Sequence, residues 1–261
     1  MKKIFIGFTA FSIILMGSTN LFAGHHESNE VLEPFNMQVQ MCKLNEGVTI
    51  EKYDQMISEY VEWSRKNDVD LYFARQEPIF THNNFGNTPE YDFLEILASP
   101  HKVAGQGWDK WLGTKDGQKL NKKWQSLATC FVKMGNAYPV YLDEKELNSD
   151  DNRVATWNWC SVNEGVKAED IFAQHDIMAK EVAKNPNGLI GWIALSPRIG
   201  TANAPGEFAH IGFYSDIEAK MQYEDDFANG GWKSYRDYNE NFATCSGEAL
   251  MSDVVINRAD D

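Results

Sequence analysis

The chain has 261 residues, of which 38 are acidic and 24 basic, so its formal net charge at pH 7 is −14. A surface of this charge repels nucleic acids and anionic lipids, and neither is an expected partner. The length is sufficient for one large domain or two small ones.

The first 23 residues have the pattern of a secretory signal peptide. Lys2 and Lys3 precede an apolar stretch at 4–16, and Ala23 is a small residue suited to cleavage. The alternative is a membrane anchor, but the stretch is short for a span of about 20 residues, and no second long apolar run follows. We therefore expect cleavage after residue 23 and a soluble, periplasmic or secreted protein that does not contact the membrane.

After a flexible tail at 24–33, the chain shows the order strand, helix, strand, strand, helix, strand twice. The elements predicted in the first half are strands at 35–42, 70–76, 91–98 and 130–134, with helical segments at 49–67 and 100–127; an extension of the fourth strand to 141 is the alternative. The elements predicted in the second half are strands at 154–160, 189–195, 208–214 and 244–254, with helical segments at 167–184 and 216–241. We expect two units, at 34–145 and 152–256.

The two halves also resemble each other in sequence. The segment 42–48 resembles 160–166 at an offset of 118, and 127–130 resembles 242–245 at an offset of 115. Matches in the same order at nearly constant offsets indicate a duplication. The repeated β-α-β-β-α-β order is that of a ferredoxin-like unit, so the predicted fold class is α+β with two tandem ferredoxin-like units.

This topology predicts how the cysteines pair. The first and fourth strands of a ferredoxin-like unit are antiparallel neighbours, and Cys42 ends the first strand where Cys130 begins the fourth. Cys160 and Cys245 occupy the same places in the second half. Of the three pairings that four cysteines allow, we expect disulfides Cys42–Cys130 and Cys160–Cys245. A metal site is the alternative, but the chain has no C-x-x-C and no His at ligand spacing to a Cys.

With this element order, the motifs Gly107-Trp108-Asp-Lys-Trp111 and Gly231-Trp232 make the chain resemble the dimeric α/β-barrel superfamily. That superfamily includes antibiotic-biosynthesis-type monooxygenases, EthD-like and NIPSNAP-like proteins. The resemblance implies that two sheets pair face to face in a barrel, here within one chain that would be a monomeric pseudo-dimer. It also implies cavities between sheet and helices or inside the barrel.

The first strand of each unit alternates between an apolar and a polar face. The apolar face, expected to meet the helices, consists of Met37, Val39, Met41, Ala155, Trp157 and Trp159. The polar face consists of Gln38, Gln40, Thr156 and Asn158. In a barrel we expect the polar face to turn inward and bind a ligand; the alternative is a solvated sheet face.

Glu95 and His210 occupy equivalent places on the third strands. If they face each other or a common cavity, they could perform acid–base catalysis, because His titrates near neutrality. The simpler interpretation is one exposed and one hydrogen-bonded strand residue. Arg75 lies within a strand and could bind an anionic group of a ligand, although a surface position is an equal expectation.

Eight tryptophans are many for this length. Core packing is their usual role, but a surplus can line an apolar pocket, and we include Trp108 and Trp192 among the candidate ligand-binding residues.

No cofactor is predicted, but two histidine groups deserve mention as metal-binding candidates. The resemblance implies that a His could hold haem, as in some superfamily members, and His82 and His101 flank the third strand. His175 is expected on a helix surface. Cleavage after residue 23 would expose an N-terminal amine near His25 and His26, a set that can chelate Cu(II).

Four functions remain open. The first is an exported protein that binds a small, largely apolar molecule; the second, implied by the resemblance, is a cofactor-independent monooxygenase or isomerase-like enzyme. A haem- or copper-binding protein and a structural role are further alternatives. The sequence has no phosphate-binding glycine loop, nucleophile elbow or HExxH, which disfavours nucleotide-dependent enzymes and hydrolases. An enzyme should place Glu95, His210 or Arg75 in an enclosed pocket with a shifted pKa.

Overall fold

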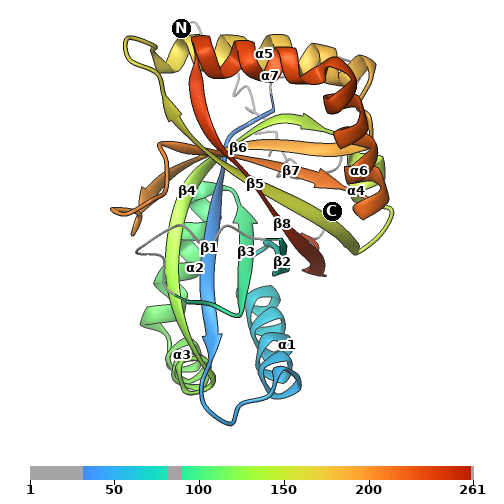
Figure 1. The fold of residues 1–261 in the computed structure, drawn as a ribbon. Coiled ribbons are helices and arrows are strands. Elements are labelled where there is room, and N and C mark those ends of the chain that lie inside the picture. The colour runs from blue at the N-terminus through green and yellow to red at the C-terminus, as the bar shows by residue number, and fades with distance from the viewer. Residues whose placement is uncertain (1–31, 81–89, 260–261) are drawn as a thin grey trace, which may run out of the picture.

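The computed structural model describes residues 32–80 and 90–259 (Figure 1). The expected signal peptide, most of the expected tail, and the candidate residues His25, His26 and His82 lie outside the described residues. Within them, no helix has the length and apolar character needed to cross a bilayer.

The described strands close a single antiparallel barrel in the order β1-β3-β2-β8-β5-β7-β6-β4. Its strands are β1 (Phe35–Leu44), β2 (Tyr72–Phe80), β3 (Phe93–Ser99), β4 (Ala128–Leu142), β5 (Asn152–Val162), β6 (Leu189–Ile199), β7 (Phe208–Tyr214) and β8 (Ala243–Asn257). Each half has the same relative order, β4-β1-β3-β2 and β8-β5-β7-β6, and the halves join where β2 pairs with β8 and β4 pairs with β6. β4 and β8 are longer than predicted because each pairs with strands of both halves. β4 pairs with β1 of its own half and with β6 of the other, and β8 pairs with β5 of its own half and with β2 of the other.

Helices cover the outside of this barrel in two separate layers (Figure 1). The helices of the first half are α1 (Ile50–Lys66), α2 (His101–Gly113) and α3 (Lys115–Leu127). Those that follow are α4 (Glu144–Leu147), α5 (Ala168–Lys184), α6 (Ile217–Asp226), the π-helical turn η1 (Phe227–Gly231) and α7 (Trp232–Asn241). Thr49 caps α1 as predicted, because its hydroxyl accepts a hydrogen bond from the backbone N–H of Lys52. The short helix α4 was not predicted.

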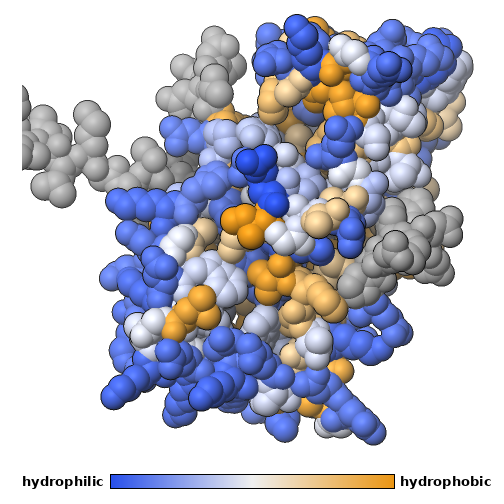
Figure 2. All heavy atoms as spheres, turned by 90° about the vertical axis from the view of Figure 1, so that its left-hand side faces the viewer, coloured by the Kyte–Doolittle hydropathy of each residue, from blue (hydrophilic) through white to orange (hydrophobic). Residues whose placement is uncertain are grey.

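The interior of the barrel is mainly apolar, and side chains of both halves contribute to it. Met37 and Ile96 of the first half belong to the same buried cluster as Trp157 and Ile211 of the second. Each helical layer packs on an outer face of the barrel through clusters of its own. On the molecular face shown in Figure 2, hydrophobic side chains form small groups among hydrophilic ones.

The expected orientation of the first strands was therefore wrong. The apolar face of β1 and β5 points into the barrel, and the polar face points toward the helices, where Gln38 accepts a hydrogen bond from Trp108 of α2. The physical reason is that the closed interior is lined by two sheets and offers few polar partners, whereas a helical layer supplies indole and hydroxyl groups.

Both predicted disulfides are confirmed. Cys42 lies directly opposite Cys130 in the β1–β4 pair, and Cys160 lies directly opposite Cys245 in the β5–β8 pair. The bonds close loops of 88 and 85 positions, so each links the two ends of its half.

Removal of one disulfide should destabilise the protein strongly. A loop of this length corresponds to about 4 kcal/mol of chain entropy in the unfolded state. The double variant Cys42→Ser/Cys130→Ser should therefore lose about 4 kcal/mol of unfolding free energy in urea titrations. Cys160→Ser/Cys245→Ser is the matched comparison, and a loss below about 1 kcal/mol in both would contradict the prediction.

Candidate functional site

A cavity of about 70 Å³ lies between the outer face of β1 and β3 and helices α1 to α3. We call it the helix-side cavity. Its aromatic wall is formed by Tyr60, Trp63, Phe73, Trp108, Trp111 and Trp124. Its polar wall is formed by Asn36, Gln38, Gln40, Glu95 and Ser99. Strand alternation explains the polar wall, because every second residue of a strand faces the same side.

The register of β1 against β3 arranges these polar groups in pairs. Gln40 lies opposite Glu95, and Asn36 lies opposite Ser99. The side chain of Gln38 accepts a 2.8 Å hydrogen bond from Trp108 Nε1, which leaves its amide N–H groups directed at no described partner.

Several buried polar groups at this cavity lack a protein partner. Among the described residues, no hydrogen bond is formed by the side chains of Asn36, Gln40 or Ser99, although each residue is less than a tenth exposed. The indole N–H of Trp63 is fully buried and also unpartnered. Because unpaired buried polar groups are unfavourable, a cavity with several of them is suited to a ligand that forms hydrogen bonds.

Glu95 is the ionisable group of the cavity, and it is 1% exposed. Its Oε2 accepts a 3.0 Å hydrogen bond from the Tyr53 hydroxyl, which in turn accepts one of 2.9 Å from Trp124 Nε1. On the other side, Arg75 Nη2 lies 3.4 Å from Glu95 Oε1, while Arg75 Nη1 lies 2.6 Å from Asp54 Oδ1. Arg75 is thus shared between two carboxylates, with the closer contact to Asp54.

This environment tunes the acidity of Glu95. Burial raises the pKa of its carboxyl to about 7, although the Arg75 guanidinium opposes the shift. Burial also raises the pKa of Tyr53, so its hydroxyl stays protonated and donates to the carboxylate. A carboxyl with a pKa near neutrality can both accept and release a proton at ordinary pH, as acid–base catalysis requires.

At the equivalent place in the second half, His210 belongs to a neutral hydrogen-bonded cluster. Trp192 Nε1 donates to His210 Nδ1 at 2.8 Å, and His210 Nε2 lies 3.3 Å from the Tyr238 hydroxyl. Because an indole N–H only donates, His210 carries its proton on Nε2. Tyr238 then donates to His175 Nε2 at 3.0 Å, and His175 Nδ1 remains buried without a partner.

Both histidines of this cluster stay uncharged. Burial, and then the nearby His175, hold the pKa of His210 well below its usual value, and burial lowers that of His175 to about 4. His210 is packed against Phe208 and Trp192 and does not line the helix-side cavity.

Glu95 and His210 therefore do not meet the condition for joint acid–base catalysis, because they do not share a cavity. β3 and β7 both direct these side chains outward, and a different helical layer covers each one. His175 was expected on a helix surface but is 2% exposed, and Arg75 is buried by its two carboxylate partners.

The other predicted ligand-binding residues divide between the halves. Gln38, Gln40 and Trp108 line the helix-side cavity with Glu95, and Arg75 contacts Glu95. Thr156, Asn158 and Trp192 lie in the second half and do not line the helix-side cavity. The site also uses residues that were not singled out: Tyr53, Trp63, Trp124, Asn36 and Ser99. Tyr53 lies on the buried side of α1, the one signal that could have pointed to it.

No histidine lines the helix-side cavity, and the haem candidate His101 is exposed, with Nε2 3.0 Å from Asn136 Oδ1. His210 also lies near Cys160 and Cys245, with ligand atoms within 4.8 Å of one another, but the two sulfurs are joined in a disulfide and are not thiolates.

No protein-family model matches the sequence, and no curated protein sequence matches it. Among solved structures, a "putative monooxygenase" from Lactobacillus acidophilus aligns with a TM-score of 0.51 at 13% identity, over 88% of this chain and 97% of that one. A protein of the same description from Fusobacterium nucleatum aligns with a TM-score of 0.52 at 12% identity, over 87% and 94%. A chlorite dismutase variant from Candidatus Nitrospira defluvii aligns more weakly, with a TM-score of 0.49 at 10% identity over 84% and 90%. What this chain shares with the two proteins described as putative monooxygenases is the fold.

Ionisation of Glu95 should make the stability pH-dependent. Its pKa is raised from 4.5 to about 7 in the folded state, so its stabilising contribution is complete below about pH 4.5 and is lost as the pH rises through 7. Between pH 5 and 8 the loss should be roughly 2 to 3 kcal/mol. Glu95→Gln should remove this part of the pH dependence in urea titrations at both pH values.

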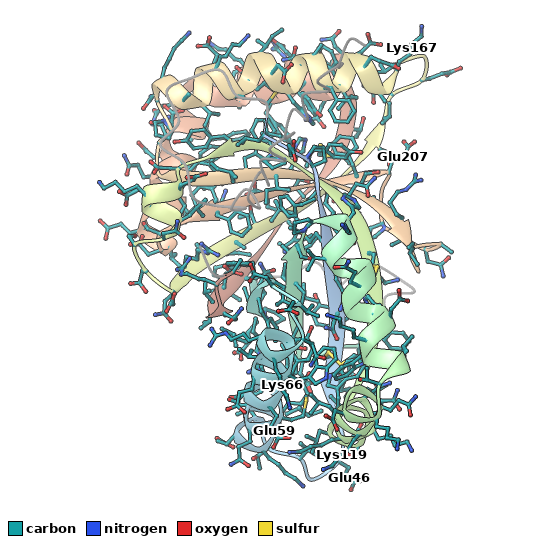
Figure 3. The ribbon with its side chains drawn as sticks, turned by 180° about the vertical axis from the view of Figure 1, so that it is seen from behind. Glu46, Glu59, Lys66, Lys119, Lys167 and Glu207 are labelled. Carbon is teal, nitrogen blue, oxygen red and sulfur yellow. A yellow bond between two sulfur atoms is a disulfide. The ribbon has the colours of Figure 1, made fainter. Side chains whose placement is uncertain are left out.

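The matched control is Glu59→Gln, which removes a carboxylate from α1, the helix that also carries Tyr53 (Figure 3). The Glu59 side chain is half exposed, so it lacks the burial that raises the pKa of Glu95. The two buried histidines contribute equally to both variants and cancel in the comparison. Identical pH profiles for Glu95→Gln and Glu59→Gln would contradict the assignment.

Proposed function

We propose that this protein is exported, binds a small, largely apolar molecule in the helix-side cavity, and exchanges a proton with it through Glu95. The observation that carries the proposal is the buried Glu95 carboxyl, with a pKa of about 7, at the wall of a cavity that also holds unpartnered amide groups. Two disulfides are compatible with an oxidising compartment and so support export.

We further infer that the halves are diverged copies of one ferredoxin-like unit and that the chain acts as a monomer. Equal strand order and equivalent disulfides support the duplication. The two halves already stand face to face in one barrel, as two subunits would. The proton transfer is then confined to the first half. In the second half, the position equivalent to Glu95 and the space around it are occupied by the aromatic side chains of the His210 cluster.

The size and lining of the cavity limit the ligand. A volume of about 70 Å³ is well below that of a drug-sized pocket and accommodates a molecule with few non-hydrogen atoms. The aromatic wall favours an apolar body, while Gln40 and the amide of Gln38 can hold one carbonyl or hydroxyl group in front of Glu95.

In this geometry Glu95 would remove a proton from the carbon next to such a carbonyl group. Tyr53 and Arg75 stabilise the carboxylate before the transfer, and the protonated carboxyl can return the proton to the same or a neighbouring atom. Removal of the proton and its return at a different atom is the chemistry of an isomerase-like enzyme, whereas removal alone is the first step of a cofactor-independent monooxygenase. The similarity to proteins described as monooxygenases agrees with this class at the level of fold.

Exchange of carbon-bound hydrogen tests the proposal directly. Acetone and cyclopentanone serve as probes in D2O, with deuteration at the carbon next to the carbonyl followed by NMR from pH 5 to 9. The rate above buffer should rise with an apparent pKa of about 7, as the base form of Glu95 accumulates, and Glu95→Gln should abolish it.

Glu59→Gln is again the control and should keep the full rate. Binding of the probes, followed through tryptophan fluorescence, should survive in Glu95→Gln. Binding without any enzyme-dependent deuteration would show a binding protein without chemistry and overturn the catalytic part. Absence of both would overturn the site.

Haem or copper binding stays a prediction for His25, His26 and His82, which lie outside the described residues.

A further inference from the structure

A second, larger cavity of about 500 Å³ lies inside the barrel. We call it the barrel cavity. Both halves line it, since Met37 and Ile96 come from the first half and Ile193 and Phe213 from the second. An eight-stranded barrel is just wide enough to be filled by side chains or to hold one small ligand, and this volume is in the range of small-molecule sites.

The barrel cavity is separate from the helix-side cavity. Met37 of β1 points into the barrel, whereas its neighbours Asn36 and Gln38 point to the helices. Ile96 and Glu95 of β3 are divided in the same way. The sheet itself therefore stands between the two cavities, and no residue lines both.

The lining of the barrel cavity has an apolar and a polar part. The apolar part includes Phe35, Met37, Ile96, Ala98, Leu142, Leu147, Ile193 and Phe213. The polar part includes Arg65, Tyr72, Gln76, Asn148, Arg153, Asp253 and Arg258. These polar residues gather where the ends of α1 and α4 meet β8, because Arg65 donates to Asn257 and both Arg153 and Arg258 donate to the carbonyl of Leu147.

Most charges in the polar part of the lining are already paired. Arg153 Nε lies 2.6 Å from Asp253 Oδ2, and both side chains are almost fully buried. Asp253 Oδ1 also accepts a hydrogen bond from Gln76, whose own oxygen accepts one from Trp157. The hydrogen bonds among Arg153, Asp253, Gln76 and Trp157 hold these side chains in place at the wall of the cavity. The buried carboxylate of Asp253 is neutralised by Arg153.

One cation of the polar part is not balanced. Arg258 pairs with Asp151 at 2.8 Å, whereas Arg65 donates only to the neutral Asn257 at 2.6 Å and has no carboxylate partner within residues 32–80 and 90–259. Arg65 is exposed at the end of α1, next to Lys66, which Figure 3 labels. A guanidinium with free donors at the rim of an apolar cavity is suited to a carboxylate.

We propose that the barrel cavity binds an amphiphilic organic acid, with its apolar chain between the two sheets and its carboxylate at Arg65. Among the cationic residues that line the cavity, Arg153 is paired with Asp253, and Arg258 is paired with Asp151, which lies outside the lining. Arg65 is therefore the cation left for the ligand, and it selects a monoanion over a neutral or cationic amphiphile. The chain as a whole has a net charge of −14, so the unpaired positive charge of Arg65 is a property of this cavity and not of the protein surface in general.

The test uses decanoate, decanol and decyltrimethylammonium, which share a chain and differ in head group, in calorimetric titrations of the full chain. Decanoate should bind once per chain, decanol about tenfold or more weakly, and the ammonium compound without saturation. Arg65→Gln should weaken decanoate binding about tenfold and leave decanol unchanged. Lys66→Gln, which removes the neighbouring charge that does not line the cavity, should leave both unchanged.

Substitution of a small lining residue by a larger one tests whether the ligand binds inside the barrel cavity. Ala98 lines it and is 3% exposed, so Ala98→Phe should abolish binding of decanoate and decanol; if circular dichroism shows that this variant does not fold, Ala98→Leu should weaken both. Glu95→Gln should bind decanoate normally, which separates this site from the helix-side cavity. No decanoate binding, equal affinity for decanoate and decanol, or unchanged binding in a folded Ala98 variant would each overturn the proposal.

Discussion

Closure of the barrel is the constraint from which the remaining features follow. Once β2 pairs with β8 and β4 with β6, every strand has one face inside and one face under helices. The interior receives side chains from both halves and is enclosed by sheet on all sides, so it has to be apolar except where polar groups pair with each other. The polar side chains of β1 and β3 are consequently directed to the helical layer, and the helix-side cavity exists because of that division.

The two halves use the same position under their helices in opposite ways. In the first half a carboxylate, a guanidinium and a second carboxylate form a charged set that reaches from the buried Glu95 to the half-exposed Asp54. In the second half the equivalent place holds the neutral ring His210, and Ala194 replaces the arginine opposite it. A charged group under the helices needs a counter-charge and leaves polar space, whereas neutral rings pack closely. This explains why the cavity with unpartnered amides lies in the first half.

Arg153 and Asp253 show how the barrel tolerates charge in its apolar interior. The pair joins β5 to β8, and hydrogen bonds from Gln76 and to Leu147 satisfy further polar atoms of both partners. Burial of either charge alone would be strongly unfavourable, so the two are linked in folding. The same pair also lines the barrel cavity and belongs to its polar part.

Much of the architecture was determined by the sequence alone. The offsets between the halves indicated duplication, the period-2 alternation located the strands, and the positions of Cys42 and Cys130 predicted a disulfide that the β1–β4 register confirms. The alternation also grouped Gln38 with Gln40 correctly on one face. Only the tertiary structure decided that this face meets the helices and that Glu95 and His210 lie in separate layers. Alternation determines which residues share a face of a strand. Which face the other half covers depends on strand pairs between residues 49 to 184 positions apart, such as Leu142 with Gly191 and Phe73 with Asn257, and no local pattern records them.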